Sequence, residues 1–247
     1  MGIKALMTDL LVRVFCLIRC LIRMPLKPFM LLSFLFFSSN VFSFSYEDGL
    51  EMIKGKNYKE AYVILHDLAV QGDGKAQHGL AVMYDQGYGV QKNMTEAVKW
   101  FTKAAEQGLA DSQYSLGISY EQGWGTKADG SEAARWFMKA AGQGHGLAQY
   151  NLGVKFLKGE GVTQNYNEAM KWFIKAAMQD IEDAQYSLGV MYENGAGVSK
   201  NIEEAKKWYL KAAKNGSTKA QVRLSELRLK PSGSETNDTY LRTSTFR

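Results

Sequence analysis

The sequence predicts an all-α protein, an α-α superhelical solenoid of 36-residue helix-turn-helix repeats preceded by a hydrophobic segment. Two observations carry this prediction. Glutamine and tryptophan recur every 36 residues, at Gln77, Gln113, Gln149, Gln185 and Gln221 and at Trp100, Trp136, Trp172 and Trp208. No proline occurs between residues 29 and 230, as expected of a segment that is almost entirely helical. A repeat of this length buries its apolar face only by stacking on its neighbours.

Residues 1–45 have the features of an export signal. Lys27 precedes the uncharged apolar run P-F-M-L-L-S-F-L-F-F, and small polar residues follow it. A basic region, an apolar region and a small-residue region in this order are typical of a cleaved secretory signal peptide. Met24 begins a shorter signal of the usual form, so it is an alternative to Met1 as the start of translation.

An uncleaved membrane anchor is the other interpretation of residues 1–45, because residues 10–22 add apolar weight. Arg13 and Arg19 interrupt that run, and the uncharged core is shorter than the roughly 20 residues of a spanning helix. We therefore expect export by the secretory route to the periplasm or the exterior. Anchoring in the inner membrane is the alternative, and we expect no other membrane contact.

The positive charge of the chain is concentrated before the repeats. The formal net charge is +5. Residues 1–45 hold five basic residues and one acidic residue, an excess of +4, which leaves about +1 for residues 46–247. Nucleic-acid binding needs clustered basic side chains, so we expect no nucleic-acid partner.

The second helix of each repeat is marked at both ends. An Asn or Asp that can cap the helix precedes it, and a glutamate stands three residues later, as in a capping box. The caps are Asn93, Asp129, Asn165 and Asn201, and the glutamates are Glu96, Glu132, Glu168 and Glu204. Alanine and an aromatic pair recur on one helical face, so we interpret the tryptophans as core side chains. Lysine and then glycine mark the end of the helix, although Asp180 replaces the glycine in the third full repeat.

The first helix of each repeat carries an interior glycine, at Gly117, Gly153 and Gly189. Each costs about 1 kcal/mol of helix propensity relative to alanine, and a cost that recurs in every repeat indicates close packing against another helix. A G-x-G sequence then follows, at residues 87–89, 123–125, 159–161 and 195–197. Glycine readily adopts positive φ, so this sequence predicts a sharp turn between antiparallel helices.

The combined motif, L-G-x-x-Y-x-x-G-x-G-V-x-x-N-x-x-E-A-x-x-W-x-x-K-A-A, resembles the Sel1-like repeat, a relative of the tetratricopeptide repeat with a slightly longer unit. The resemblance implies a scaffold that binds proteins, with the first helices on a concave face. The expected organisation is a degenerate unit over 46–72, four full units over 73–216, a capping helix over 217–230 and a disordered polar tail over 231–247, so that the solenoid spans 46–230.

The repeats offer no residue pattern that is typical of catalysis or metal binding. Cys16 and Cys20 precede the repeats, and the three histidines fall in different units without the spacing of a metal site. The G-x-G sequences lack the lysine and the preceding strand of a phosphate-binding loop. We therefore predict no catalytic residue, no cofactor and no metal ion, and we expect that the chain is not an enzyme.

Partner binding is predicted on the first helices, through aromatic anchors beside apolar and acidic side chains. The candidate residues are Tyr114, Tyr150, Tyr186, Ile118, Val154, Val190, Glu121 and Glu193. Such a surface suits an extended peptide or a partner helix. A different interpretation of the tyrosines, that they pack between repeats, stays open.

The expected function is an exported scaffold or adaptor for a partner protein or peptide. Two other functions stay open. Some exported, cysteine-rich members of the family have been linked to hydrolysis of cell-wall material or β-lactams, but the repeats of this chain hold no cysteine. The third hypothesis is an adaptor anchored in the inner membrane.

Overall fold

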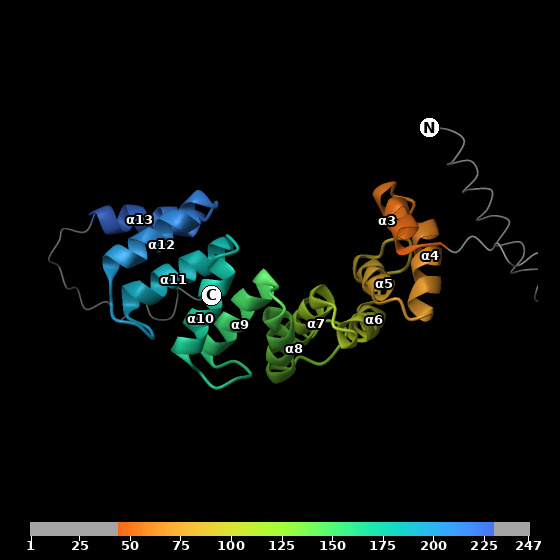
Figure 1. The fold of residues 1–247 in the computed structure, drawn as a ribbon, viewed down its shortest axis with the longest axis horizontal. Helices are drawn as coiled ribbons and strands as arrows, with labels where there is room; N and C mark the ends of the chain where they lie inside the picture. Colours follow the sequence, from red (N-terminus) through yellow and green to blue (C-terminus); the bar gives the residue numbers. More distant parts are fainter. Residues whose placement is uncertain (1–43, 230–247) are drawn as a thin grey trace, which may run out of the picture. The chain divides into compact units, whose positions relative to one another are not determined.

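The computed structural model describes residues 44–229 (Figure 1). Within that range the chain forms eleven helices and no strand. The helices are α3 (Tyr46–Lys54), α4 (Tyr58–Val70), α5 (Gly74–Gln86), α6 (Met94–Glu106), α7 (Ala110–Gln122), α8 (Gly130–Gly142), α9 (Gly146–Lys158), α10 (Tyr166–Ala177), α11 (Glu182–Asn194), α12 (Ile202–Lys214) and α13 (Thr218–Leu229). The predicted signal or anchor and the predicted disordered tail fall outside the described residues, apart from positions 44 and 45. No described helix combines the length and apolarity that membrane crossing requires.

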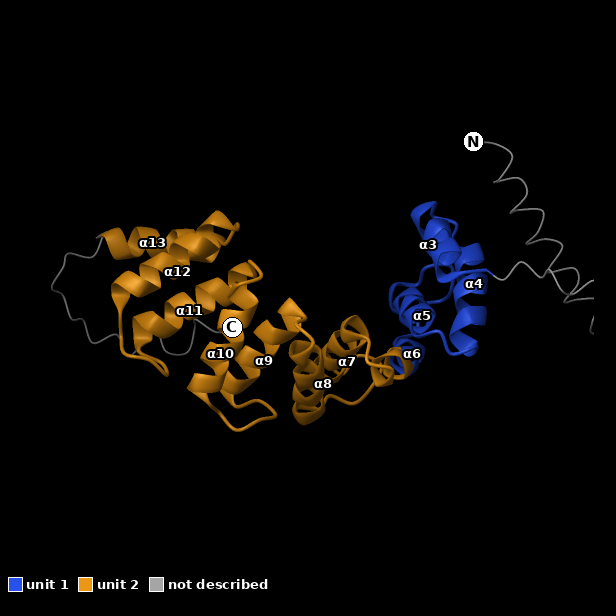
Figure 2. Ribbon diagram, viewed as in Figure 1, with its two compact units in different colours: residues 1–100 blue, residues 101–247 orange. Residues whose placement is uncertain are grey.

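The chain divides into two compact units, residues 1–100 and 101–247, with the division inside α6 (Figure 2). In the first unit α3 packs on α4, and α4 packs on α5. In the second unit each helix from α7 to α13 packs on the next one along the chain. Contacts between sequence neighbours are those of a stacked repeat array. The all-helical solenoid predicted from the 36-residue period is confirmed.

The two helices of a repeat meet most closely at the interior glycine of the first helix. A Cβ atom at Gly153 would lie 2.7 Å from Cδ1 of Phe173, whose side chain is completely buried. The same contact joins Gly117 to Phe137 and Gly189 to Tyr209. The predicted close packing is confirmed, and the group that requires it is an aromatic ring on the second helix.

The tryptophans pack one repeat against another. Trp136 is buried, and Trp172 and Trp208 pack on core clusters that include α8 and α10, the second helices of the preceding repeats. In these three repeats the lysine three residues after the tryptophan lies over the indole ring, with its Nζ 4.1–4.3 Å from the ring centroid. The interpretation of the tryptophans as core residues is confirmed for Trp136, while Trp100, Trp172 and Trp208 are partly buried and pack against the core.

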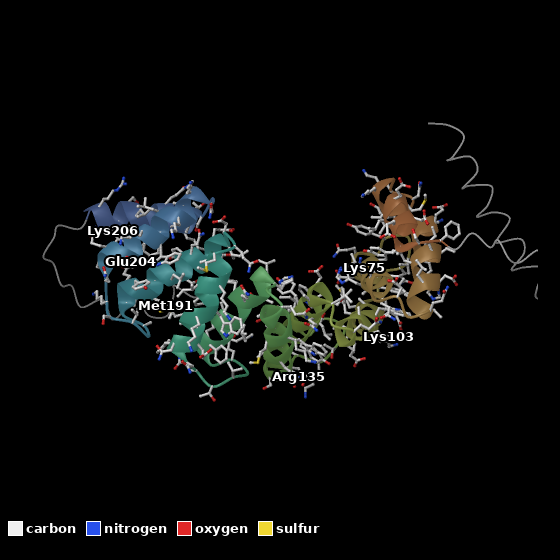
Figure 3. The ribbon with its side chains drawn as sticks, in the orientation of Figure 1. Lys75, Lys103, Arg135, Met191, Glu204 and Lys206 are labelled. Atoms are coloured by element: carbon white, nitrogen blue, oxygen red, sulfur yellow. The ribbon has the colours of Figure 1, made fainter. Side chains whose placement is uncertain are left out.

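The predicted N-caps of the second helices form, but the capping boxes do not. In α8, Oδ1 of Asp129 accepts hydrogen bonds from the backbone N–H groups of Ser131 and Glu132 at 2.9 and 3.0 Å. The backbone N–H of Asp129, which a capping box would reserve for the glutamate, donates to the carbonyl of Tyr120 at 2.8 Å. Glu132 pairs instead with Arg135, one turn further along α8, at 2.5 Å. The equivalent pairs are Glu96–Lys99, Glu168–Lys171 and Glu204–Lys207, and Figure 3 labels Arg135 and Glu204 on the second helices.

The G-x-G turn both reverses the chain and joins it to the preceding repeat. Gly159 and Gly161 have φ values of 75° and 76°, as the sequence predicts. A Cβ atom at Gly161 would collide with the backbone of Gly130, at the start of α8. Asp180, where the pattern has glycine, also adopts a positive φ of 58°, and its carboxylate accepts a hydrogen bond from Asn215 at 3.1 Å.

We expect Gly153→Ala to destabilise the chain by about 1–3 kcal/mol, the usual cost of overpacking a core, because the new methyl group meets Phe173. The gain in helix propensity, about 1 kcal/mol, offsets part of this cost. Gly142→Ala is the control, since no atom lies within 4 Å of a Cβ at this exposed position, and we expect it to be neutral or stabilising. Urea unfolding followed by circular dichroism measures both. A Gly153→Ala protein as stable as the parent would contradict this packing.

Candidate functional site

The three predicted tyrosines lie at one position of consecutive first helices in the second unit, α7, α9 and α11. Each is half-buried and packs on the buried aromatic ring of its own repeat. The ring centroids are 6.0 Å apart in Tyr114–Phe137, 5.8 Å in Tyr150–Phe173 and 5.4 Å in Tyr186–Tyr209. The core of each repeat therefore holds its tyrosine ring in place.

All three tyrosines also pack on residues of the following first helix. Tyr114 packs on the cluster that includes Ala148 and Leu152 of α9, Tyr150 on the cluster that includes Ala184 and Leu188 of α11, and Tyr186 on the cluster that includes Ala220 of α13. The ring of Tyr114 also stacks on His145, with the centroids 4.6 Å apart. The interpretation that these tyrosines pack between repeats is therefore supported for all three. Part of each ring stays accessible to a partner.

The three predicted aliphatic residues differ in accessibility. Ile118 and Val154 are partly exposed beside the tyrosines. Val190 is only 3% exposed, because it packs in a cluster with Tyr209 and with Ala220 of α13. The prediction that Val190 contacts a partner is therefore wrong for this conformation, and Val190 is a core residue.

The two predicted acids form ion pairs with the next first helix. Oε1 of Glu121 on α7 lies 2.6 Å from Nζ of Lys155 on α9. Glu193 on α11 pairs with Arg223 on α13 and accepts a hydrogen bond from the hydroxyl of Tyr209 at 2.8 Å. Burial and the adjacent Glu193 carboxylate raise the pKa of Tyr209, so its hydroxyl keeps the proton that it donates. Both acids therefore connect repeats and are not free charges at the edge of a groove.

Lys155 is a charged residue at a repeat position that is otherwise uncharged, because Met83, Ser119 and Met191 occupy the equivalent positions (Figure 3 labels Met191). Its side chain is 4% exposed, and Nζ lies 2.6 Å from Glu121 and 3.2 Å from Glu160. A buried charge without a partner is strongly destabilising, so Lys155 can be buried here only because it pairs with these carboxylates. The sequence signal was a lysine at a position that holds methionine or serine in the other full repeats, and the repeat motif did not include this position.

The recurring glutamine, to which the sequence assigned no role, links the repeats through its buried amide. Nε2 of Gln149 donates to the carbonyl of Ala141 at the end of α8, at 3.2 Å, and Oε1 accepts from Gln179 at 2.8 Å. The same bonds join Gln113 to Ala105 and Gln143, and Gln185 to Ala177 and Asn215. Because the glutamine amide both donates and accepts a hydrogen bond, it specifies how each repeat packs on the preceding one.

The residues of α7, α9 and α11 whose pKa is shifted take part in packing contacts. Desolvation raises the pKa of Tyr150 to about 12, and the nearby Asp183 carboxylate adds to this effect. Within residues 44–229, no group of His, Cys, Asp and Glu side chains could hold a metal ion.

We expect Tyr150 to ionise near pH 12, because burial disfavours the phenolate. The folded pKa lies above the unfolded value of about 10, so this contribution to stability is complete below pH 10 and is lost as the pH rises towards about 12. The difference in tyrosinate absorbance between the parent and Tyr150→Phe measures the pKa, and the same difference in urea gives the unfolded reference. Coincident titrations in the two conditions would contradict the burial of this phenol.

We expect Glu121→Ala to destabilise the chain by about 1–3 kcal/mol, because it leaves the buried Lys155 with fewer partners. Lys155→Met introduces the residue found at this position in two of the other repeats, Met83 and Met191, and should be neutral or stabilising, as replacement of buried ion pairs often is. In that background Glu121→Ala should lose most of its cost. Urea unfolding of the parent, both single variants and the double variant measures the coupling. An equal cost of Glu121→Ala in both backgrounds is the contrary result.

Known proteins share this repeat fold. The Sel1 repeat model matches residues 74–109, 110–145, 146–181 and 182–217. The chain is similar to a Sel1 repeat protein from Oxalobacter formigenes, with 37% identity and a TM-score of 0.71 over 74% of this chain and 75% of that one. It is also similar to c5321, a protective antigen present in uropathogenic Escherichia coli strains, with 34% identity and a TM-score of 0.71 over 74% of this chain.

The match spans 40% of the length of the Escherichia coli antigen. A search of curated proteins found no match. The four repeats cover more than half of the sequence and confirm the resemblance of the motif. The chain therefore belongs to the Sel1 repeat family, whose members are protein-interaction scaffolds.

Proposed function

We propose that this protein is an exported scaffold that binds a partner protein or peptide on the first-helix face of its second unit. This face consists of the tyrosine row on α7, α9 and α11 with the neighbouring Ile118 and Val154. The observation that carries the proposal is the alignment of Tyr114, Tyr150 and Tyr186, each of which rests on a buried ring. Aromatic side chains that are already held in place bind a partner at a low cost in conformational entropy.

The chemistry of the face favours a partner of low net charge. Its two central acids, Glu121 and Glu193, are neutralised by ion pairs within the protein. The groups left for recognition are tyrosine rings, short aliphatic side chains and polar side chains such as Asn151 on α9. Such a surface suits an extended peptide or one side of a helix.

Export is proposed from the sequence of residues 1–45, with secretion through a cleaved signal preferred to anchoring in the inner membrane. The hydrolase alternative rests on relatives with paired cysteines, and the two cysteines of this chain both precede the described residues. We propose no catalytic role.

Affinity capture from the native envelope and secreted fractions tests the binding face, with the full chain as bait. Ile118→Arg combined with Val154→Arg places charge on the first-helix face. Met138→Arg combined with Leu210→Arg is the matched control, because these second-helix residues are 46% and 52% exposed. We expect the first-helix variant to capture at least about 10-fold less partner than the parent. This corresponds to a loss of about 1.4 kcal/mol of binding free energy.

The control variant should retain the same partner as the parent, and circular dichroism should show equal helicity in all three proteins. Equal capture by the first-helix variant would sink the proposed face. The N-terminal peptide of the recovered chain tests export at the same time. A mature N-terminus within residues 38–46 supports a cleaved signal, and an intact hydrophobic segment supports the anchored alternative.

A further inference from the structure

The last described helix, α13, exposes a face that a second helix covers in the preceding repeats. Gln221, Leu224, Ser225 and Arg228 line an open groove of about 400 Å3 on this helix. Thirty-six residues earlier, on α11, the equivalent residues are Gln185, Leu188, Gly189 and Tyr192. We call the surface lined by the four residues of α13 the α13 groove.

On α11 the equivalent face is covered by α12. Leu188 is completely buried there, and Gly189 lies against the ring of Tyr209 of α12. On α13 the equivalent leucine, Leu224, is partly exposed, and the small residue at the glycine position, Ser225, is exposed. The α13 groove therefore has the form of a surface on which a helix packs, and no described residue fills it.

The contacts at the two ends of α12 show how a helix is held on such a surface. At its start, the backbone N–H of Asn201 donates to the carbonyl of Tyr192 at 2.8 Å. At its end, Asn215 donates to Oε1 of Gln185 at 3.0 Å. The equivalent groups on α13 are the carbonyl of Arg228 and the exposed side-chain amide of Gln221. Hydrogen-bonding positions for both ends of a docked helix are therefore available.

We propose that the α13 groove is a second docking site, and that it binds an amphipathic helix of a partner protein with an acidic first turn and a buried aromatic residue. Charge complementarity supports the acidic turn. Arg228 stands where the full repeats have tyrosine or phenylalanine, beside the expected start of the docked helix. Lys206 of α12 (Figure 3), which replaces Ala134 and Met170 of the earlier second helices, pairs with Glu203 of its own helix at 2.8 Å, so the positive charge of the groove comes from Arg228.

The second helices of the chain define the remaining chemistry of the partner. The aromatic residue of α12, Tyr209, stands eight residues after the cap Asn201, and Ala212 follows three residues later. An aromatic ring at this spacing would rest over Ser225, and a small residue after it would allow close approach to Leu224. The expected motif is therefore a capped helix with glutamate in its first turn, an aromatic residue two turns later and alanine one turn beyond that.

Two other occupants fit less well. In the register of the repeats, residues 230–247 place Ser244 and Thr245 where α12 has Trp208 and Tyr209, so the aromatic anchor is missing. A second copy would have to supply one of its own second helices. The anchor rings of those helices, such as Phe173, are completely buried, so a copy could supply one only by opening a repeat.

The probe is a synthetic fluorescent peptide with the sequence of residues 165–180, N-Y-N-E-A-M-K-W-F-I-K-A-A-M-Q-D, which contains the required cap, glutamate, aromatic pair and alanines. Fluorescence anisotropy measures its binding to the full chain. We expect saturable binding that weakens with added salt. A control peptide with Trp172→Ala and Phe173→Ala should bind at least about 10-fold more weakly, and one with Glu168→Gln should bind a few-fold more weakly.

Two variants of the protein locate the site. Ser225→Tyr fills the space reserved for the incoming ring and should weaken binding of the peptide at least about 10-fold. Val222→Tyr adds a tyrosine on the same helix, at a residue that is 52% exposed and does not line the groove, and should leave binding unchanged. Both substitutions are on the surface, and circular dichroism verifies the fold.

Absence of saturable binding, or equal binding by the Ser225→Tyr variant, would overturn the proposal. Binding that appears only after removal of residues 230–247 would assign the groove to the chain's own C-terminal segment and would also overturn it. A dimer of the parent that Ser225→Tyr dissociates, seen by sedimentation, would assign the groove to a second copy with the same consequence. The α13 groove and the first-helix face use different residues, so each proposal can fail without the other.

Discussion

The contact between the interior glycine of each first helix and the buried ring of its second helix is the constraint on which the rest of the second unit depends. At Gly153, the absence of a side chain lets Phe173 pack against the backbone of α9. The same ring then supports Tyr150 on the first-helix face. A side chain at the glycine position would displace the ring and with it the surface residue. The same core contact therefore positions the residues of the proposed binding surface.

Polar groups decide how the repeats are stacked, and apolar groups supply most of the driving force. Burial of aromatic and aliphatic side chains is not directional, so it does not choose one register between helices. The amide of Gln149 bonds to the end of the preceding second helix and to Gln179 in its own repeat, and these bonds are directional. Such links hold the tyrosines of successive repeats in a fixed arrangement. A surface arranged in this way before binding loses less conformational entropy when a partner arrives.

The parts of the structure that local chemistry decides were predictable. The N-cap of α8 at Asp129 and the left-handed turn at Gly159 and Gly161 were identified from residue type and spacing alone. The reciprocal bond of Glu132 was predicted and does not form, because the backbone N–H of Asp129 is used by the carbonyl of Tyr120. A motif cannot show this competition, because the competing acceptor is brought to the site by the packing of two helices.

The sequence by itself determined the repeat length, the helix pairs, the family and the tyrosine row, because each of these follows from a pattern that recurs every 36 residues. Only the tertiary structure decided which of the predicted partner-binding residues are exposed and which are paired. It buries Val190 beneath α13 and neutralises Glu121 with Lys155. It also leaves the α13 groove open. Accessibility and charge pairing depend on groups from neighbouring repeats, and a pattern within one repeat holds no information about distances to the next.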